Sequence, residues 1–138
     1  MRAALIDRLA LGPDLFELIA KDEQGWPAIS WHWFQRGDPF PAIALSKISP
    51  GEEWTHDGPD GLDRPRVRFD LRGTDADQLE LLSAALKAEM RLEREISGWR
   101  FHPATLEADR EIPLGEQDGG EGLLQLQLEF MFYIEETD

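Results

Sequence analysis

The chain has 138 residues, of which 41% are hydrophobic, so it suits one domain, residues 1–138, with a single core. Its 28 acidic and 14 basic residues give a net charge of −14, which repels phosphate and disfavours binding to nucleic acid or to an anionic membrane surface. There is no cysteine, which excludes disulfides and thiol chemistry, and no apolar run approaches the roughly 18 residues of a membrane span, so we expect no membrane contact.

The N-terminal segment is predicted to be helical. Apolar residues share one face over residues 1–11, and Gly12-Pro13 is expected to end this helix. Asp14 is the expected cap of a short second helical turn. The first helix is therefore one of the two principal helices that we expect.

Three strands are predicted in the middle of the chain. Apolar and polar residues alternate over 28–34, 41–49 and 66–71, and the last two are expected to pair with each other. The connection between them, about 50–65, is long for a hairpin loop. We expect it to form a β-hairpin arm, which would also bury Trp54.

The second half is predicted to hold one long helix and three further strands. The helix is expected to start at Thr74 as cap and to run to about residue 96, with Gly98 as its left-handed C-terminal residue. Weaker strand patterns cover 99–101 and 105–112, and a strong alternation covers 124–135.

The long helix has an apolar arc wide enough to cover a sheet and to meet a neighbour beside it. The arc contains Leu79, Leu81, Leu82, Ala85, Leu86, Ala88, Met90, Leu92 and Ile96. Together these elements predict an α+β fold, with a mainly antiparallel sheet, two principal helices on one face and a long β-hairpin arm.

No pattern in the sequence indicates catalysis or a metal. The histidines fall on three separate segments, at His32, His56 and His102. The acids Asp57, Asp60 and Asp63 are spaced by three residues, whereas a calcium loop needs a spacing of two. There is no nucleophile elbow and no phosphate-binding glycine loop. We therefore expect no enzyme activity and no cofactor.

A cluster of arginines lies around the third predicted strand, at Arg64, Arg66, Arg68 and Arg72. One strand face with this many guanidinium groups can meet phosphate. In so acidic a chain they are expected instead to pair with carboxylates of a neighbouring strand, helix or subunit.

Three consecutive stretches resemble a known family. They are PAIALSKIS at 41–49, DGPDGL at 57–62 and RVRFDL at 66–71, followed by the helix after Thr74. This strand–loop–strand pattern is similar to that of the tail-completion (tail-terminator) family of long-tailed bacteriophages and of phage-derived gene transfer agents. The resemblance covers roughly residues 1–96 and, loosely, the final strand.

The resemblance implies a structural role without catalytic residues. Tail terminators form a ring, expected here to be a hexamer, on the head-proximal end of the tail tube. The ring stops tube polymerisation and presents a surface to the head-completion (stopper) protein, while DNA passes through its centre. The chain would then belong to a virion or phage-like particle and be present in the host cytoplasm during assembly.

A closed ring requires two different complementary patches on each subunit. We expect contacts with the next subunit or the tube to come from the loop and from the arginine cluster. The candidate residues are Glu52, Trp54, His56, Asp57, Gly58, Pro59, Asp60, Gly61, Arg64, Arg66, Arg68 and Arg72. The alternatives are another neck (head–tail connector) protein, an acidic DNA mimic that inhibits a DNA-handling enzyme, and a small hydrolase.

Overall fold

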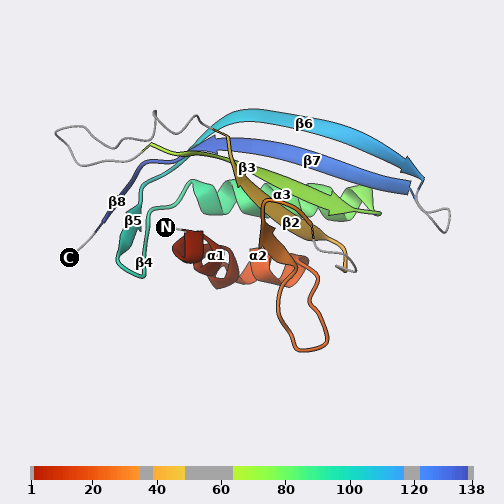
Figure 1. Ribbon diagram of the computed structural model, residues 1–138, viewed down its shortest axis with the longest axis horizontal. Helices are drawn as coiled ribbons and strands as arrows, with labels where there is room; N and C mark the ends of the chain where they lie inside the picture. The colour runs from red at the N-terminus through yellow and green to blue at the C-terminus, as the bar shows by residue number, and fades with distance from the viewer. Residues whose placement is uncertain (1, 35–38, 49–63, 117–121, 137–138) are drawn as a thin grey trace.

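The computed structural model describes residues 2–34, 39–48, 64–116 and 122–136. Its elements are α1 (Arg2–Leu11), α2 (Pro13–Leu18), β1 (Ile29–Trp31), β2 (Ala42–Lys47), β3 (Arg66–Gly73), α3 (Ala76–Met90), β4 (Arg94–Ile96), β5 (Trp99–Phe101), β6 (Thr105–Glu116), β7 (Gly122–Met131) and β8 (Ile134–Glu136). The helices lie on one side of a curved sheet (Figure 1). Two of them are longer, α3 with 15 residues and α1 with 10.

The main sheet has five strands in the order β1-β2-β3-β7-β6. Strand β1 runs parallel to β2, and all other neighbouring pairs are antiparallel. A second sheet, β4-β5-β8, is antiparallel throughout and lies at one end of the molecule (Figure 1). The predicted α+β class with a mainly antiparallel sheet is therefore confirmed.

The central strand β3 carries the alternation that the sequence predicts. Phe69 and Leu71 are fully buried and face the helices, opposite Leu45 and Ile43 of β2. The predicted pairing of these two strands is therefore confirmed. On the other side, β3 pairs with β7, where Phe69 lies opposite Leu128.

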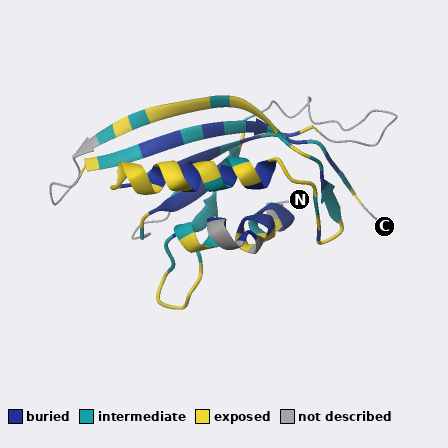
Figure 2. Cartoon of the chain, turned by 180° about the vertical axis from the view of Figure 1, so that it is seen from behind, coloured by how far each residue is buried: buried dark blue, intermediate teal, exposed yellow. Residues whose placement is uncertain are grey.

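Helix α3 covers the sheet with one face. Leu79, Leu82, Leu86 and Met90 recur at helical spacing and are all fully buried. Figure 2 shows this face in dark blue toward the sheet and the opposite face in yellow toward solvent. Helices α1 and α2 pack next to α3, and the buried apolar residues of all layers form one core cluster.

The prediction that the long helix continues to about residue 96 is wrong. Helix α3 ends at Met90, and residues Arg94–Ile96 form β4. Ser97 (φ 51°) and Gly98 (φ 83°) then make the two-residue turn to β5. Gly98 does adopt a left-handed conformation, but in a hairpin rather than at a helix end.

Groups from distant parts of the chain bind carbonyls at and just beyond the end of helix α3. The guanidinium of Arg8, on α1, donates to the carbonyls of Glu89 (2.7 Å) and Leu92 (2.8 Å). The amide of Ala104 donates to the carbonyl of Met90 (2.8 Å). At Met90 the Ala104 amide takes the place of a helical donor, and at Glu89 the Arg8 guanidinium adds to the bond from the amide of Leu92 (3.1 Å). Arg8 and Ala104 come from distant parts of the chain, so the local apolar period does not reveal them.

Both predicted helix caps are also wrong. Asp75 caps α3 instead of Thr74: its carboxylate accepts from the amides of Asp77 (3.0 Å) and Gln78 (3.3 Å). Helix α2 begins at Pro13, with Gly12 as N-cap and no side-chain cap, so Asp14 lies inside the helix. Proline at the first helical position needs no hydrogen bond for its nitrogen, which explains this start.

The strand predicted over 124–135 is divided between the two sheets. Strand β7 ends at Met131, and β8 begins at Ile134 and pairs with β5. The amide of Phe132 donates to the carbonyl of Pro65 at this bend (2.8 Å). Phe132 and Ile134 remain buried, so the alternation continues across the bend and does not indicate it.

Two other strands differ in length from the prediction. Strand β1 covers only Ile29–Trp31, and β6 extends to Glu116 with two register shifts against β7. The predicted β-hairpin arm is not confirmed, because residues 49–63 lie outside the described residues. None of the described helices is long and apolar enough to span a membrane.

Candidate subunit interface

The candidate interface residues divide into a loop and a strand. The loop members lie outside the described residues: Glu52, Trp54, His56, Asp57, Gly58, Pro59, Asp60 and Gly61. The other four are described: Arg64 is exposed just before β3, and Arg66, Arg68 and Arg72 are half-buried on it. The last three alternate with the buried apolar residues, so they share the sheet face that points away from the helices.

The arginines of β3 are bound within the subunit. Arg68 Nε donates to Asp70 Oδ2 (3.1 Å) on the same strand. Arg72 donates through Nε (3.0 Å) and Nη2 (2.7 Å) to Oε1 of Gln125 on β7, and Gln125 Nε2 donates to Asp70 Oδ1 (3.2 Å). This network links β3 to β7 across the outer face, so two of the predicted interface arginines already have partners inside the chain.

Burial has an electrostatic consequence at Arg72. Desolvation lowers the pKa of this guanidinium, and the nearby charge of Asp70 acts in the opposite direction. Its plane also lies 4.2 Å from the ring centroid of Phe34, which is a cation–π contact. Arg72 is therefore held on three sides and stabilises this face.

Arg66 is held less firmly than Arg68 and Arg72. Its Nη2 lies 3.9 Å from Glu107 Oε1 of β6, which is at the outer limit of an ion pair, and both side chains are about 40% exposed (41% and 37%). Its buried Nε has no hydrogen-bond partner among the described residues. Among the arginines of β3, Arg66 is thus the one best able to bind a carboxylate of another molecule.

A hollow of about 330 Å³ lies on this outer face. The lining residues are His32, Trp33, Phe34, Ala44, Arg68, Asp70, Arg72 and Gln125. Trp33 is 67% exposed at its rim, and His32 has a left-handed backbone (φ 78°). The polar side chains along the floor of this hollow bind one another.

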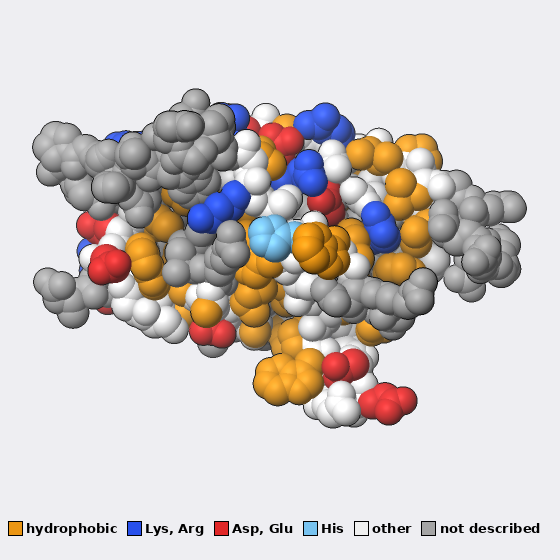
Figure 3. Space-filling view, in the orientation of Figure 1, with side chains coloured by type: hydrophobic (Ala, Val, Ile, Leu, Met, Phe, Trp, Pro, Cys, Tyr) orange, Lys and Arg blue, Asp and Glu red, His pale blue; other side chains and the backbone are white. Residues whose placement is uncertain are grey.

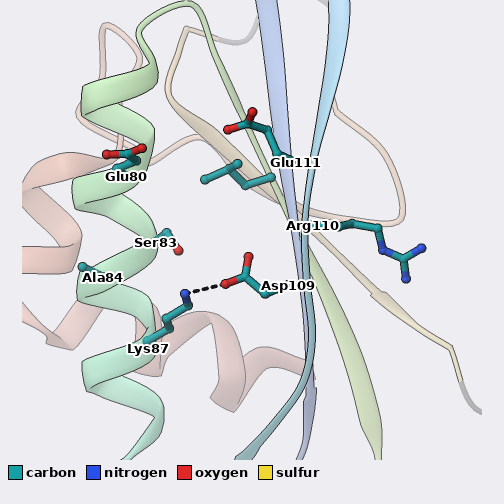
Figure 4. A pocket seen from close by; sticks show the side chains of 8 residues that line it. Glu80, Ser83, Ala84, Lys87, Asp109, Arg110 and Glu111 are labelled. Atoms are coloured by element: carbon teal, nitrogen blue, oxygen red, sulfur yellow. Dashed lines mark hydrogen bonds and ion pairs between the residues drawn. The ribbon is translucent and has the colours of Figure 1, made fainter.

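A second hollow, of about 400 Å³, lies between α3 and β6 (Figure 4). Lys87 Nζ and Asp109 Oδ2 form an ion pair of 2.6 Å across it. Figure 4 shows Asp109 and Glu111 pointing toward the helix and Arg110 pointing away from it. Ser83 also lines this hollow, and no histidine is among its described lining residues.

Sequence reasoning missed a buried ionic network between the helices. The side chain of Arg8 is fully buried and that of Glu89 is 5% exposed; Arg8 Nε donates to Glu89 Oε2 (3.0 Å). Arg94 of β4 donates to both oxygens of the same carboxylate, through Nε (2.9 Å) and Nη2 (3.0 Å). Two guanidinium groups therefore share one carboxylate.

The sequence does contain a signal for this network. Arg8 lies three residues after Leu5, and Glu89 lies three residues after Leu86, so each charged residue sits on the apolar face of its helix. A charge on a buried face needs a partner of opposite sign. The opposite charges on the apolar faces of these two helices therefore indicate an ion pair between them.

The described histidines lie in different places. His32 follows β1, whereas His102 follows β5 and contacts Glu93 (3.1 Å) and Glu135 (2.9 Å). His56 lies outside the described residues. Within the described part of the chain, no group of three or more histidine or acidic residues has a metal-binding arrangement.

Comparisons with known proteins inform the fold alone. No protein-family model and no curated protein matches this chain. One solved structure aligns with 95% of this chain and with 92% of its own chain, at 13% sequence identity and a TM-score of 0.50. At this identity the likeness concerns the α+β architecture and does not extend to function.

Proposed function

We propose that this chain is a tail terminator: a structural protein that forms a hexameric ring on the head-proximal end of a phage-like tail tube. The observation that carries the proposal is the strand–loop–strand resemblance over residues 41–71. The pairing of β2 with β3 is compatible with it, because the two strands that flank the loop are antiparallel neighbours. The loop would therefore leave and re-enter the body at one end of the sheet.

In a closed ring, each subunit would contact its two neighbours through two different surfaces. We assign one of these surfaces to the loop. Trp54 would be its aromatic anchor, and Gly61 would set the shape of its turn. Arg66 extends this patch from the adjacent end of β3, where its bonds within the chain are weakest. Arg68 and Arg72 support the patch by holding the sheet face in place.

The net charge of −14 supports the proposed passage of DNA. A ring of such subunits would present acidic walls to DNA, which would repel the phosphate backbone and prevent adhesion. The proposed partners are therefore further copies of the chain, the tail tube protein and the head-completion protein. DNA would pass through the ring without being bound.

The test is deletion of the gene in a strain that produces the particles, followed by negative-stain electron microscopy. We expect overlong or headless tails beside DNA-filled heads without tails. Particles of normal length and composition would refute the proposal. Complementation with the unchanged gene is the control, and it should restore normal particles.

Variants of the loop test the assigned contact. Trp54→Ala or Gly61→Val, expressed in the deletion strain, should fail to restore normal tails although the purified chain is folded by circular dichroism. Leu106→Ala is the control, because it removes an exposed apolar side chain outside the loop and outside the arginine face. Full restoration by both loop variants would contradict the assignment.

A further inference from the structure

The exposed face of α3 carries an apolar stripe that nothing in the described chain covers. Leu81 is 60% exposed, Leu92 is 47% exposed, and Ala84 and Ala88 between them are also exposed. Helical spacing puts Leu81, Ala84 and Ala88 on one side of α3, next to the side that covers the sheet, and Leu92 follows two residues after the helix ends. A stripe of this kind on a folded protein usually marks a contact surface.

This stripe borders a groove between α2 and α3. The groove has a volume of about 310 Å³ and is mainly apolar; its lining residues are Gly12, Leu15, Ala85, Ala88, Glu89, Leu92 and Arg94. Gly12 leaves room at one wall, since a Cβ atom there would lie 3.2 Å from Glu89 Oε1. The small residues thus form a depression of a size that admits an aromatic side chain.

The groove is positively charged at its floor, although the chain as a whole is acidic. Glu89 is the one carboxylate among the described lining residues, and it binds both Arg8 and Arg94, so this group of three carries a net charge of +1. The Arg94 side chain remains 38% exposed. The groove therefore offers an apolar wall and a guanidinium, which together favour an aromatic ring flanked by acids.

The same chain presents such a group on the loop between α2 and β1. Trp26 is 70% exposed, and Asp22 and Glu23 beside it are exposed as well. Figure 1 shows this loop projecting from the body away from the sheet, and Figure 3, in the same orientation, shows a large hydrophobic group next to acidic side chains at its tip.

Hydrogen bonds within the loop and at its base support this position. Asp22 Oδ1 accepts from the amides of Gln24 (2.9 Å) and Trp26 (3.0 Å), and the amide of Asp22 donates to the carbonyl of Trp26 (2.9 Å). At its base, Lys21 Nζ donates to the carbonyls of Phe16 (2.7 Å) and Ile19 (2.9 Å). Because these bonds hold the backbone of the loop before it binds, less backbone entropy is lost when Trp26 is covered, which favours binding.

We propose that the Trp26 loop of one copy of this chain docks into the α2–α3 groove of a second copy. Trp26 would fill the apolar depression beside Ala88 and Leu92, and its ring would meet the guanidinium of Arg94. Asp22 and Glu23 would lie over the net positive floor. The two surfaces are different, so the contact is heterologous and can close into a ring. The inference rests on the proposed homo-oligomeric ring and identifies a further contact within it.

Site-specific cross-linking tests the contact, because the natural chain has no cysteine. Gln24→Cys and Ala88→Cys chains are mixed at high concentration and treated with a short bismaleimide. We expect cross-linked dimers from the mixture and few from either chain alone. Thr105→Cys, an exposed position on β6, replaces Ala88→Cys in the control mixture. A yield no higher than this control would overturn the proposal, and self-linking of Ala88→Cys alone would show that the groove meets a second groove instead.

Two substitutions then test the chemistry of the contact. Trp26→Ser and, on the other surface, Ala88→Glu should each weaken self-association about 30-fold in sedimentation experiments, as loss of an interface anchor does. Leu106→Ser removes another exposed apolar side chain and should leave association unchanged. Equal association of wild type and both contact variants would overturn the proposal.

Failure of this contact and failure of the tail-terminator role are distinguishable. Overlong tails in the deletion strain without cross-links between Gln24→Cys and Ala88→Cys would retain the role and refute the contact. Specific cross-links together with normal particles would retain the contact and refute the role.

Discussion

Replacing Glu89 with glutamine tests whether the buried ionic network stabilises the fold. Glutamine has nearly the same size, but it removes the charge that balances Arg8 and places an amide group against two guanidinium groups. Three side-chain hydrogen bonds now end on the carboxylate, one from Arg8 and two from Arg94. Arg8 is fully buried and would keep its charge without a counter-charge.

Removal of one partner from a buried ion pair costs about 3–5 kcal/mol. We expect the lower end, about 3 kcal/mol, because Arg8 Nη2 still donates to the backbone carbonyls of Glu89 and Leu92 in the variant. A domain of this kind is stable by about 5–15 kcal/mol. The substitution would therefore remove a large part of its free energy of unfolding.

Urea unfolding followed by circular dichroism measures the loss. For a slope of about 1–3 kcal/mol per molar, the midpoint should fall by roughly 1–3 M. Glu80→Gln on the exposed side of the same helix is the control and should change stability by less than about 0.5 kcal/mol. A Glu89→Gln loss no larger than this control would refute the reasoning.

A double variant separates charge from packing. Arg8→Met with Glu89→Leu removes both members of the buried pair, and such replacements are often neutral or stabilising. We expect the double variant to be more stable than Glu89→Gln alone. If it were less stable, side-chain packing and the carbonyl contacts of Arg8, rather than the uncompensated charge, would account for the loss.

The same residue predicts a pH dependence. Burial alone would raise the pKa of Glu89, but hydrogen bonds from Arg94 and Arg8 and their charges outweigh it and hold the pKa below its ordinary value of 4.5. Between the two values the unfolded chain binds more protons, so stability rises with pH there. The contribution is fully present above 4.5 and is lost as the pH falls through the lower, folded value. The difference between wild type and Glu89→Gln should therefore narrow as the pH falls below 4.5, and a difference that stays constant down to about pH 3 would contradict this.

Two further substitutions test local structure by urea unfolding. Asp75→Ala should cost about 1 kcal/mol through loss of the helix cap, whereas Thr74→Ala should cost little; the reverse order would identify Thr74 as the cap. Gly98→Ala should cost about 1–2 kcal/mol because φ is 83° there. Gly122→Ala is its control, since nothing lies within 4 Å of an added Cβ, and equal losses at both glycines would contradict the explanation.

The candidate interface was predictable only in part. The alternation over 66–71 was enough to put Arg66, Arg68 and Arg72 on one outer sheet face, because side chains on a strand alternate with period two. It did not reveal that Gln125, from a strand more than fifty residues away, would bind Arg72 and Asp70. Partners of this kind depend on strand order and register, which the sequence of one strand does not contain.

The wide apolar arc of the long helix is a similar case. Its pattern correctly indicated that one side would cover a sheet, and Leu82 and Leu86 do so. Pattern alone did not distinguish these residues from Leu81 and Leu92, which are exposed. Whether an apolar residue of the arc is buried depends on which elements pack against it. The exposed residues border the groove that we assign to a second copy.

The elements whose signal is local could be predicted from the sequence: the strands β2, β3 and β7, the existence of α3, and the α+β class. These follow from side-chain period, since a strand or helix buries one face whatever lies opposite. The ends of the elements and their packing partners, by contrast, depend on the tertiary structure. At the end of helix α3, Arg8 and Ala104 supply hydrogen-bond donors from distant segments. The strand after β7 changes sheets at Phe132 because its amide binds Pro65, while the buried side of the chain stays the same.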